Sequence, residues 1–407
     1  MDRLDTPLSI ETNRRRLLAF GAAALAAPVL GQDVDLHLAG GTGARPTTSA
    51  FPGKGRMILQ RTRPPLLETP MSVFAAHDLT PNDQFFVRWH WADIPLAVDA
   101  GTFRLKVGGK VRQPLSIGLD QLLKMPRTEL VAVNQCSGNS RGYFSPRVPG
   151  AQWGHGAMGN ARWTGVSLRH VLDLAGVAAG AGQVRFGGLD RALLPDAPDF
   201  EKALDLDHAR DGEVMIAFAM NGEQLPLLNG FPLRLIVPGW FSTYWMKGLD
   251  SIEVLAGPDE GYWMSKAYRV PATARAAVAP GAKGFPTVPI NRMPPRSWVT
   301  SLEEGQRIGF DPAIPIGGIA LGGAHAVAAV DVSSDGGRTW RAATLGPDLG
   351  RYSFRRFEAT VPLAGRGRVA LMARCRNTAG QVQPMDAIWN PGGYARDNVE
   401  TTTVVVA

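Results

Sequence analysis

Hydrophobic and polar positions alternate in short runs along most of the chain, and helix-like spacing is confined to its first two-thirds. The alternating run 103–108 ends at a Gly-Gly pair and predicts a strand and a turn. Helices are predicted over 119–125, before a proline, and over 168–175, before a glycine. The apolar run 233–237, closed by Pro-Gly, predicts another strand. These elements indicate an α+β domain over residues 70–284, without a regular βαβ repeat.

The pattern changes at a Gly- and Pro-rich linker over residues 281–295. Beyond it, the alternating runs 327–333 and 368–376 are each followed by a glycine-containing turn, and no helical periodicity remains. Short strands separated by such turns are typical of a β-sandwich. We therefore predict a second, all-β domain over residues 285–407.

The N-terminal segment has the pattern of an export signal. Arginines at 14–16 directly precede an uncharged run, 17–30, which is short for a membrane span. A charged flank, an apolar middle and small residues near the end predict a twin-arginine signal peptide over residues 1–31 and export of the folded protein to the periplasm. A basic amphipathic start that stays in place is the alternative. Residues 32–69, rich in Gly, Pro and Thr, predict an extended arm.

Composition limits the class of protein. A chain of 407 residues is long for one hydrophobic core and favours two domains. The hydrophobic content of 45% and the mean hydropathy of −0.06 are those of a soluble globular protein. The net charge of +7 suits an anionic substrate, an acidic protein partner or an acidic surface. Because no Lys/Arg cluster with interleaved aromatics follows the leader, nucleic acid is not expected as a partner.

The chain has two cysteines, too few for a disulfide scaffold. Cys136 lies where the apolar run 129–133 gives way to small turn-forming residues, and Arg141 follows five positions later. A thiolate on such a loop beside a cation can act as a nucleophile or as a soft metal ligand. A buried core thiol is the alternative. Cys375 alternates like a strand residue and is predicted to be a core thiol.

Two segments around this cysteine, 135–142 and 156–163, resemble the molybdenum-binding segment of the sulfite oxidase family, most closely the bacterial sulfite dehydrogenases that reduce cytochrome c. Segments 332–340 and 388–394 resemble the immunoglobulin-like dimerisation domain of that family. The resemblance runs from about residue 68 to the end of the chain. It implies an α+β, sulfite-oxidase-type molybdopterin-binding domain, followed by an immunoglobulin-like β-sandwich through which the protein could form a homodimer.

The resemblance also implies an activity, the oxidation of sulfite to sulfate with electrons passed to an external c-type cytochrome. No side chain can carry this chemistry, so a molybdenum ion and its pterin dithiolene would be needed. Cys136 would be the one protein ligand of the metal. The other residues that match family positions are implied to bind sulfite (Arg88 and Arg141), to hydrogen-bond the metal's equatorial oxygen (Tyr268), or to contact the pterin and its phosphate (His90, Asp190, Asn229, Arg234 and Lys247).

The chain departs from the family pattern at three points. Asn229 stands where vertebrate members have a histidine, and an amide cannot become charged. The third substrate arginine expected after Trp-Asn-Leu is missing from residues 389–392, and Arg396 is expected to fill that role. The sequence has no Cys-x-x-Cys-His and no cytochrome b5-like segment, so no haem is expected in this chain.

Three other functions remain open from the sequence. The chain could be the sulfur dehydrogenase subunit of a thiosulfate-oxidising complex, which typically lacks the stretch found at 141–144. It could be a related periplasmic reductase, such as methionine sulfoxide reductase, which lacks the C-terminal β-domain. It could also be an exported binding protein, and this last alternative predicts that no molybdenum is bound.

Overall fold

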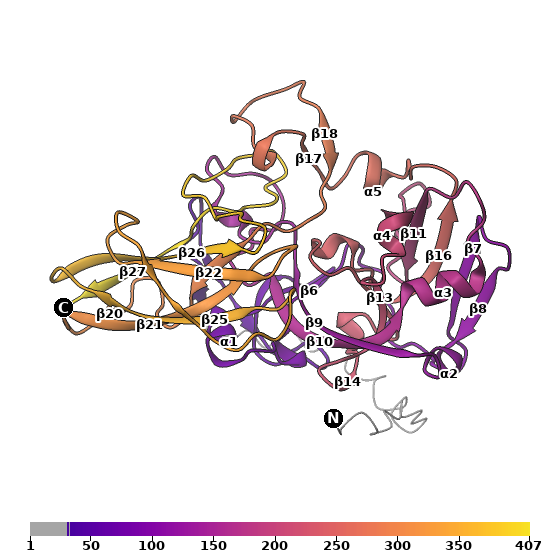
Figure 1. Cartoon of the computed structure of the whole chain (residues 1–407), viewed down its shortest axis with the longest axis horizontal. Coiled ribbons are helices and arrows are strands. Elements are labelled where there is room, and N and C mark those ends of the chain that lie inside the picture. Colours follow the sequence, from indigo (N-terminus) through magenta and orange to yellow (C-terminus); the bar gives the residue numbers. More distant parts are fainter. Residues whose placement is uncertain (1–30, 32) are drawn as a thin grey trace.

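The computed structural model describes Gly31 and residues 33–407 (Figure 1). The predicted export signal therefore lies, apart from Gly31, outside the described residues. Within the described part of the chain, no helix is long and apolar enough to cross a membrane.

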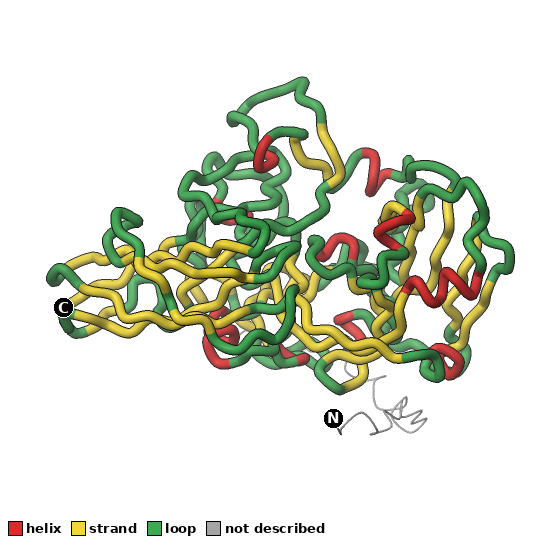
Figure 2. Tube along the Cα trace, in the orientation of Figure 1, coloured by secondary structure: helices red, strands yellow, loops and turns green. Residues whose placement is uncertain are grey.

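Strands dominate the structure, and the helices are short (Figure 2). The α+β expectation is thus corrected towards a mostly β protein with few helices. The predicted helix over 168–175 is confirmed: Gly176 ends it with a φ of +66°, and one face is buried. The helix predicted over 119–125 already ends at Leu122. The described α-helices are α1 (Met71–Ala76), α2 (Leu119–Leu122), α3 (Leu168–Ala175), α4 (Leu206–Ala209) and α5 (Tyr262–Ser265).

The first domain contains two five-stranded sheets. One has the order β14-β13-β10-β9, with β15 paired to β13, and the other has the order β12-β11-β16-β7-β8. The longest pairing joins β9 to β10, and it ends where Gln135 faces Met158, directly before Cys136. The strands are β7 (Arg104–Gly109), β8 (Leu115–Gly118), β9 (Arg127–Gln135), β10 (Met158–Ser167), β11 (Gln183–Gly188), β12 (Glu201–Asp205), β13 (Met215–Met220), β14 (Glu223–Gln224), β15 (Arg234–Ile236) and β16 (Leu249–Leu255).

The segment expected to be an extended arm contains five short strands. After a hairpin of β1 (Val34–Asp35) and β2 (Ala44–Arg45), a four-stranded sheet forms in the order β3-β4-β5-β6. The buried apolar residues of β4 and β5 pack with Val87 of β6, the strand that carries the predicted site residue Arg88. Residues 47–68 thus include strands β3 to β5 of a packed sheet, and the short apolar runs of β4 and β5 lie among scattered Pro and Gly. The strands of this sheet are β3 (Thr47–Thr48), β4 (Met57–Arg61), β5 (Leu66–Glu68) and β6 (Val87–Arg88).

The C-terminal domain consists of two sheets, of orders β19-β21-β25-β24 and β20-β27-β26-β22-β23, which share one apolar core. It is thus a β-sandwich, and the predicted strands over 327–333 and 368–376 are confirmed as β22 and β26. Cys375 is a core thiol, as predicted. The strands are β19 (Arg296–Val299), β20 (Arg307–Ile308), β21 (Ala313–Leu321), β22 (Val327–Ser333), β23 (Arg341–Ala342), β24 (Thr344–Leu345), β25 (Arg355–Pro362), β26 (Gly367–Asn377) and β27 (Thr401–Val406).

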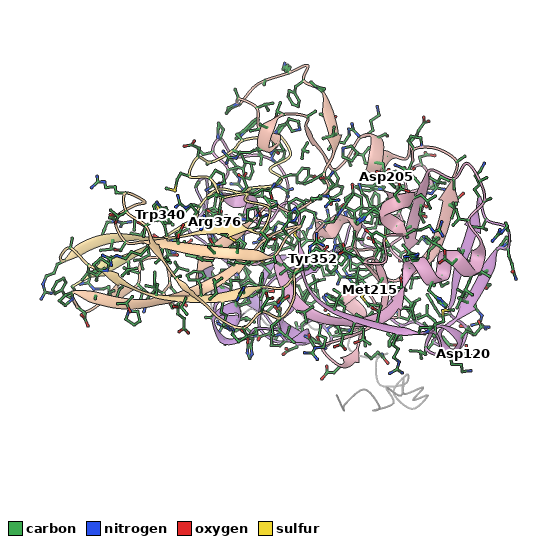
Figure 3. All side chains as sticks on the ribbon, in the orientation of Figure 1. Asp120, Asp205, Met215, Trp340, Tyr352 and Arg376 are labelled. Atoms are coloured by element: carbon green, nitrogen blue, oxygen red, sulfur yellow. The ribbon has the colours of Figure 1, made fainter. Side chains whose placement is uncertain are left out.

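The two domains are in direct contact. The β17 (Arg269–Pro271) and β18 (Thr287–Pro289) hairpin occupies part of the expected linker and projects from the body in Figure 1. Figure 3 shows Tyr352 at the junction, where its backbone carbonyl accepts the N–H of Val133 in β9 at 2.8 Å. The sandwich therefore supports the strand that leads to Cys136.

Candidate active site

Cys136 is held on a tight, buried loop at the end of β9. Its backbone N–H donates to Ala157 at 2.9 Å, and its carbonyl accepts the N–H of Asn139 at 2.9 Å. The Asn139 side chain in turn accepts the N–H of Ala157 at 3.0 Å. Cys136 lines two cavities, an inner and an outer one. The loop thus presents the thiol to open space, as a metal ligand requires.

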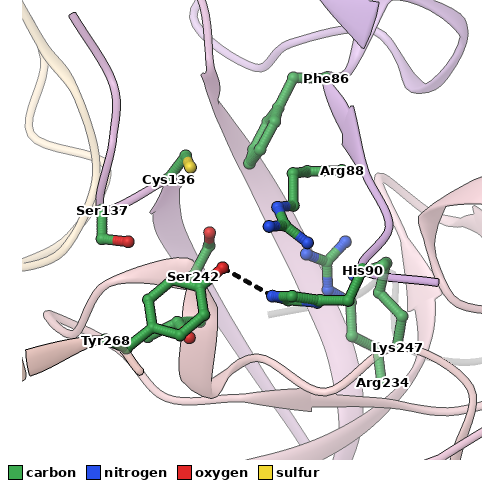
Figure 4. A pocket seen from close by; sticks show the side chains of 10 residues that line it. Phe86, Arg88, His90, Cys136, Ser137, Arg234, Ser242, Lys247 and Tyr268 are labelled. Atoms are coloured by element: carbon green, nitrogen blue, oxygen red, sulfur yellow. Dashed lines mark hydrogen bonds between the residues drawn. The ribbon is translucent and has the colours of Figure 1, made fainter. Parts of the chain in front are cut away.

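The inner cavity collects predicted residues from distant parts of the chain (Figure 4). Arg88 arrives on β6 and Arg234 on β15, while Tyr268 directly precedes β17. The residues that line this cavity are Phe86, Arg88, His90, Cys136, Ser137, Arg234, Ser242, Thr243, Lys247 and Tyr268. Six of the ten residues proposed from the sequence therefore meet in one space.

His90 and Tyr268 form a hydrogen-bonded pair, with 2.6 Å between Nε2 and the phenol oxygen. Burial, then the charge of Arg88, holds the pKa of His90 well below its usual range, so the imidazole is neutral. Burial also raises the pKa of Tyr268, which keeps the phenol protonated. Tyr268 adopts a φ of +53°, a conformation that costs a non-glycine residue about 1–3 kcal/mol. The pair thus joins a protonated phenol and a neutral imidazole by one hydrogen bond, along which a proton can be relayed.

Asp190 orients this pair from outside the cavity. Its carboxylate accepts the backbone N–H groups of His90 at 3.0 Å and of Trp91 at 2.9 Å. The nearer oxygen also lies 3.8 Å from Nδ1 of His90. In the structure Asp190 therefore positions the residues that follow β6.

Several buried polar atoms around the inner cavity have no hydrogen-bond partner. They are Nη1 of Arg88, Nδ1 of His90, Oγ of Ser137, Nε of Arg234 and Oγ1 of Thr243. None of the described residues that line this cavity is an aspartate or a glutamate. Because unpaired buried donors and uncompensated cations are costly, this arrangement suits an anionic ligand.

Arg234 and Lys247 are two basic residues that line the inner cavity. Arg234 donates to the Asn229 carbonyl at 2.9 Å and to the Asn134 side chain at 3.0 Å. Burial lowers its pKa to about 9. Burial, then the charge of Arg234, lowers the pKa of Lys247 to about 7. A bound phosphate would compensate both charges and restore both pKa values.

Asn229 contacts Arg234 through its backbone carbonyl and does not line either cavity. Its side-chain oxygen accepts from Nζ of Lys54, and its amide donates to the Phe86 carbonyl at 3.1 Å. Lys54, which sequence reasoning missed, also donates to the carbonyls of Asn82 and Phe85 at 2.8 Å each. No local sequence signal marks Lys54, because its main partner is 175 positions away.

The outer cavity lies beside the inner one and includes exposed residues. It is lined by Arg61, Leu66, Arg88, Cys136, Ser137, Arg141, Pro149, Gly150, Ala151, Trp153, Tyr268, Pro391, Gly392 and Tyr394. Arg141 reaches it as expected, with its Nε donating to the Gly392 carbonyl at 3.1 Å and its guanidinium 5.0 Å from the Tyr394 ring centre. The segment 391–394 of the C-terminal domain thus helps to form the site.

Arg396 does not take the role predicted for it. Its guanidinium binds both carboxylate oxygens of Glu400, at 2.8 and 3.0 Å, and donates to the Tyr143 carbonyl. It lines neither cavity. The expectation that Arg396 contacts the substrate is corrected, because its charge is paired with Glu400, four residues later in the chain.

Lys54 should make the free energy of unfolding depend on pH. Burial lowers its pKa to about 7 in the folded protein, whereas the unfolded value is 10.5. The unfolded state therefore binds more protons between these values, and the free energy of unfolding rises with pH in that window, by up to about 1.4 kcal/mol per pH unit. Lys54→Met should remove this contribution and flatten the slope. Denaturant unfolding from pH 6.5 to 9.5 measures it.

Lys106→Met is the matched control, because Lys106 is an exposed lysine on β7. It should leave the slope of the wild-type protein unchanged. Equal slopes for Lys54→Met and wild type would contradict the lowered pKa of Lys54.

Comparison with known proteins agrees with this geometry. Residues 91–263 match the family model described as "Oxidoreductase molybdopterin binding domain", and residues 287–399 match "Mo-co oxidoreductase dimerisation domain". Sulfite oxidase of Arabidopsis thaliana is 30% identical over 357 residues, which cover 80% of this chain and 88% of that protein. Mitochondrial sulfite oxidase of Homo sapiens is 32% identical over 81% of this chain, but only 62% of the human protein is matched.

A solved structure shares the fold across both domains. The sulfane dehydrogenase SoxCD from Paracoccus pantotrophus aligns with a TM-score of 0.70 and 25% identity. The alignment covers 84% of this chain and 87% of that one.

Proposed function

Because this chain belongs to the sulfite oxidase family of molybdopterin oxidoreductases, we propose that it oxidises sulfite to sulfate at a molybdenum centre held by Cys136. The observation that carries the proposal is the convergence of this thiol with Arg88, Arg141 and the His90–Tyr268 pair around adjoining cavities. None of the described residues that line these cavities carries a carboxylate, so an anionic substrate meets no like charge.

The residues present fit a molybdenum-pterin cofactor. When bound, this group would supply oxygen-atom transfer to sulfur and the uptake of two electrons. The Cys136 thiolate is a soft ligand that suits the metal. Arg234 and Lys247 would bind an anionic phosphate, and the unpaired hydroxyls of Ser137 and Thr243 would take further polar groups of the cofactor.

The chain's own residues would bind the substrate and move protons. Arg88 and Arg141 can bind an oxyanion through paired N–H groups of their planar guanidinium groups. Oxidation of sulfite with water gives sulfate, two protons and two electrons. The Tyr268 phenol, hydrogen-bonded to neutral His90, can pass a proton away from the reacting oxygen.

Tyr268→Phe provides the first test of this role. Loss of the hydroxyl removes the proton path but keeps the ring that packs beside Tyr394. We expect kcat for sulfite to fall by about 100-fold, with the fold intact. Steady-state kinetics and circular dichroism measure both quantities.

Tyr262→Phe is the matched control, since it removes a hydroxyl from a residue that is 50% exposed and outside both cavities. A Tyr268→Phe enzyme with the kcat of this control would show that the phenol transfers no proton.

The remaining features of the proposal concern partners and location. An external c-type cytochrome would accept the electrons one at a time, which is supported by the lack of a haem-attachment motif in these 407 residues.

The protein would be exported folded to the periplasm, supported by the arginines at 14–16 and the apolar run after them. The β-sandwich would be immunoglobulin-like and would form a homodimer, supported by the match to a dimerisation domain.

The second candidate function is sulfane dehydrogenation, favoured by the structural similarity to SoxCD. Purified holoenzyme should be offered sulfite, thiosulfate and a persulfide, with cytochrome c and ferricyanide as alternative acceptors. Sulfite oxidation with two cytochromes reduced per sulfate supports the main proposal. Electron release from the persulfide alone would favour the second candidate, and reduction of ferricyanide alone would remove cytochrome c as the acceptor.

A further inference from the structure

Arg61 lies in line with the predicted substrate arginine Arg88 across the N-terminal sheet. The strand register places Arg61 opposite Leu66 on β5, and Leu66 opposite Arg88 on β6. Residues directly opposite on adjacent strands share one face of a sheet. Arg61, Leu66 and Arg88 all line the outer cavity, so this face of the sheet forms part of the cavity wall. With strands about 4.8 Å apart, the two arginines begin about 10 Å apart.

No direct ion pair within the described residues compensates the charges of the arginines that line the outer cavity. Among the ion pairs of the described residues, none involves Arg61, Arg88 or Arg141. Burial, then the neighbouring charge of Arg88, lowers the pKa of Arg61. Three guanidinium groups around one cavity repel one another unless an anion is bound between them.

Arg61 is more exposed than the other two arginines. It stands at the end of β4, where its side chain is exposed, whereas Arg141 is buried. Like Arg88, it lies outside residues 91–263, the part that matches the molybdopterin-binding family model, whereas Arg141 lies within it. A cation at this position meets an incoming anion before the deeper arginines do.

We infer that Arg61 is a third anion-binding arginine of this site, which captures the doubly charged oxyanion at the mouth of the outer cavity and passes it to Arg88 and Arg141. This inference rests on the proposed function for the identity of the anion as sulfite. Arg61 would supply the third positive charge that Arg396 does not supply, since Arg396 is bound to Glu400. Selectivity for dianions over monoanions follows, because each added cation favours the second negative charge.

Arg61→Gln tests the inference in the holoenzyme. KM for sulfite should rise about tenfold with kcat unchanged, since the residue binds the anion and does not take part in the reaction. The decline of kcat/KM with added salt should become less steep. Arg61→Lys should recover part of the loss, which would separate charge from packing.

Arg63→Gln is the matched control. Arg63 is an exposed arginine two residues later, in the turn that follows β4, and it lines neither cavity. Its removal changes the net charge equally, so it should leave KM at the wild-type value. Equal KM values for Arg61→Gln and Arg63→Gln at low ionic strength would overturn the inference.

Sulfate binding separates this inference from the proposed function. Isothermal titration of the holoenzyme with sulfate should show about tenfold weaker binding for Arg61→Gln than for Arg63→Gln. If the wild type does not oxidise sulfite but sulfate binding still weakens, the proposed function fails and the anion site stands. If sulfate binds both variants equally, Arg61 is no anion-binding residue.

Discussion

Cys136→Ser is expected to abolish molybdenum binding and to lower sulfite turnover by at least roughly 10³-fold. A serine hydroxyl is hard and stays protonated at neutral pH, whereas the thiolate is a soft anionic ligand. The two side chains are nearly the same size, and the loop is held by backbone hydrogen bonds that do not involve the sulfur. The fold should therefore survive. Metal analysis and turnover of the purified variant measure both effects.

Cys375→Ser is the matched control for this experiment. The Cys375 thiol is fully buried in the core of the sandwich and lines neither cavity. Its replacement should cost some stability and leave molybdenum content near the wild-type value. Full molybdenum content in Cys136→Ser would rule out Cys136 as the protein ligand of the metal.

Glu400→Gln is expected to lower the free energy of unfolding by about 3–5 kcal/mol, because it leaves buried arginines without their counter-charge. Glu400 accepts from Arg296 at 2.6 Å and from Arg396 at 2.8 and 3.0 Å. Arg296 is 1% exposed and also donates to Ser140 at 3.0 Å, on the loop that carries Cys136. The substitution should therefore weaken the contact between the C-terminal domain and the loop that carries Cys136.

The pH dependence of this effect has a defined sign. Burial alone would raise the pKa of Glu400, but the charge of Arg396 and then other cations hold it at about 2, below the ordinary glutamate value of 4.5. The wild type should lose the contribution of Glu400 as the pH falls from about 4.5 to 2, and Glu400→Gln should not. Denaturant unfolding measures this, with Glu358→Gln, at an exposed position on β25, as the control. A loss no larger than that of the control would contradict the role of Glu400.

The parts predictable from sequence were those with a local signal. The α3 helix had both amphipathic spacing and a glycine stop, and β22 alternated from Val327 to Ser333. The family resemblance identified Cys136, Arg88, His90, Arg234, Lys247 and Tyr268, which meet in the inner cavity.

The parts missed depend on contacts between distant segments. Arg61 reaches the site only because β4 and β6 both pair with β5, and no spacing in the sequence reveals that register. Lys54 contacts Asn229 across 175 positions. The role expected for Arg396 is replaced by an ion pair with Glu400, which no helical spacing predicts because this segment is not helical.

The most direct test of the central claim compares sulfite turnover with molybdenum content across preparations of the wild-type protein that carry different amounts of the metal. We expect activity to rise in proportion to molybdenum and to extrapolate to zero without it, with one sulfate formed for every two electrons released. Fully loaded protein that leaves sulfite unchanged, or sulfite oxidation that does not depend on molybdenum content, would contradict the account.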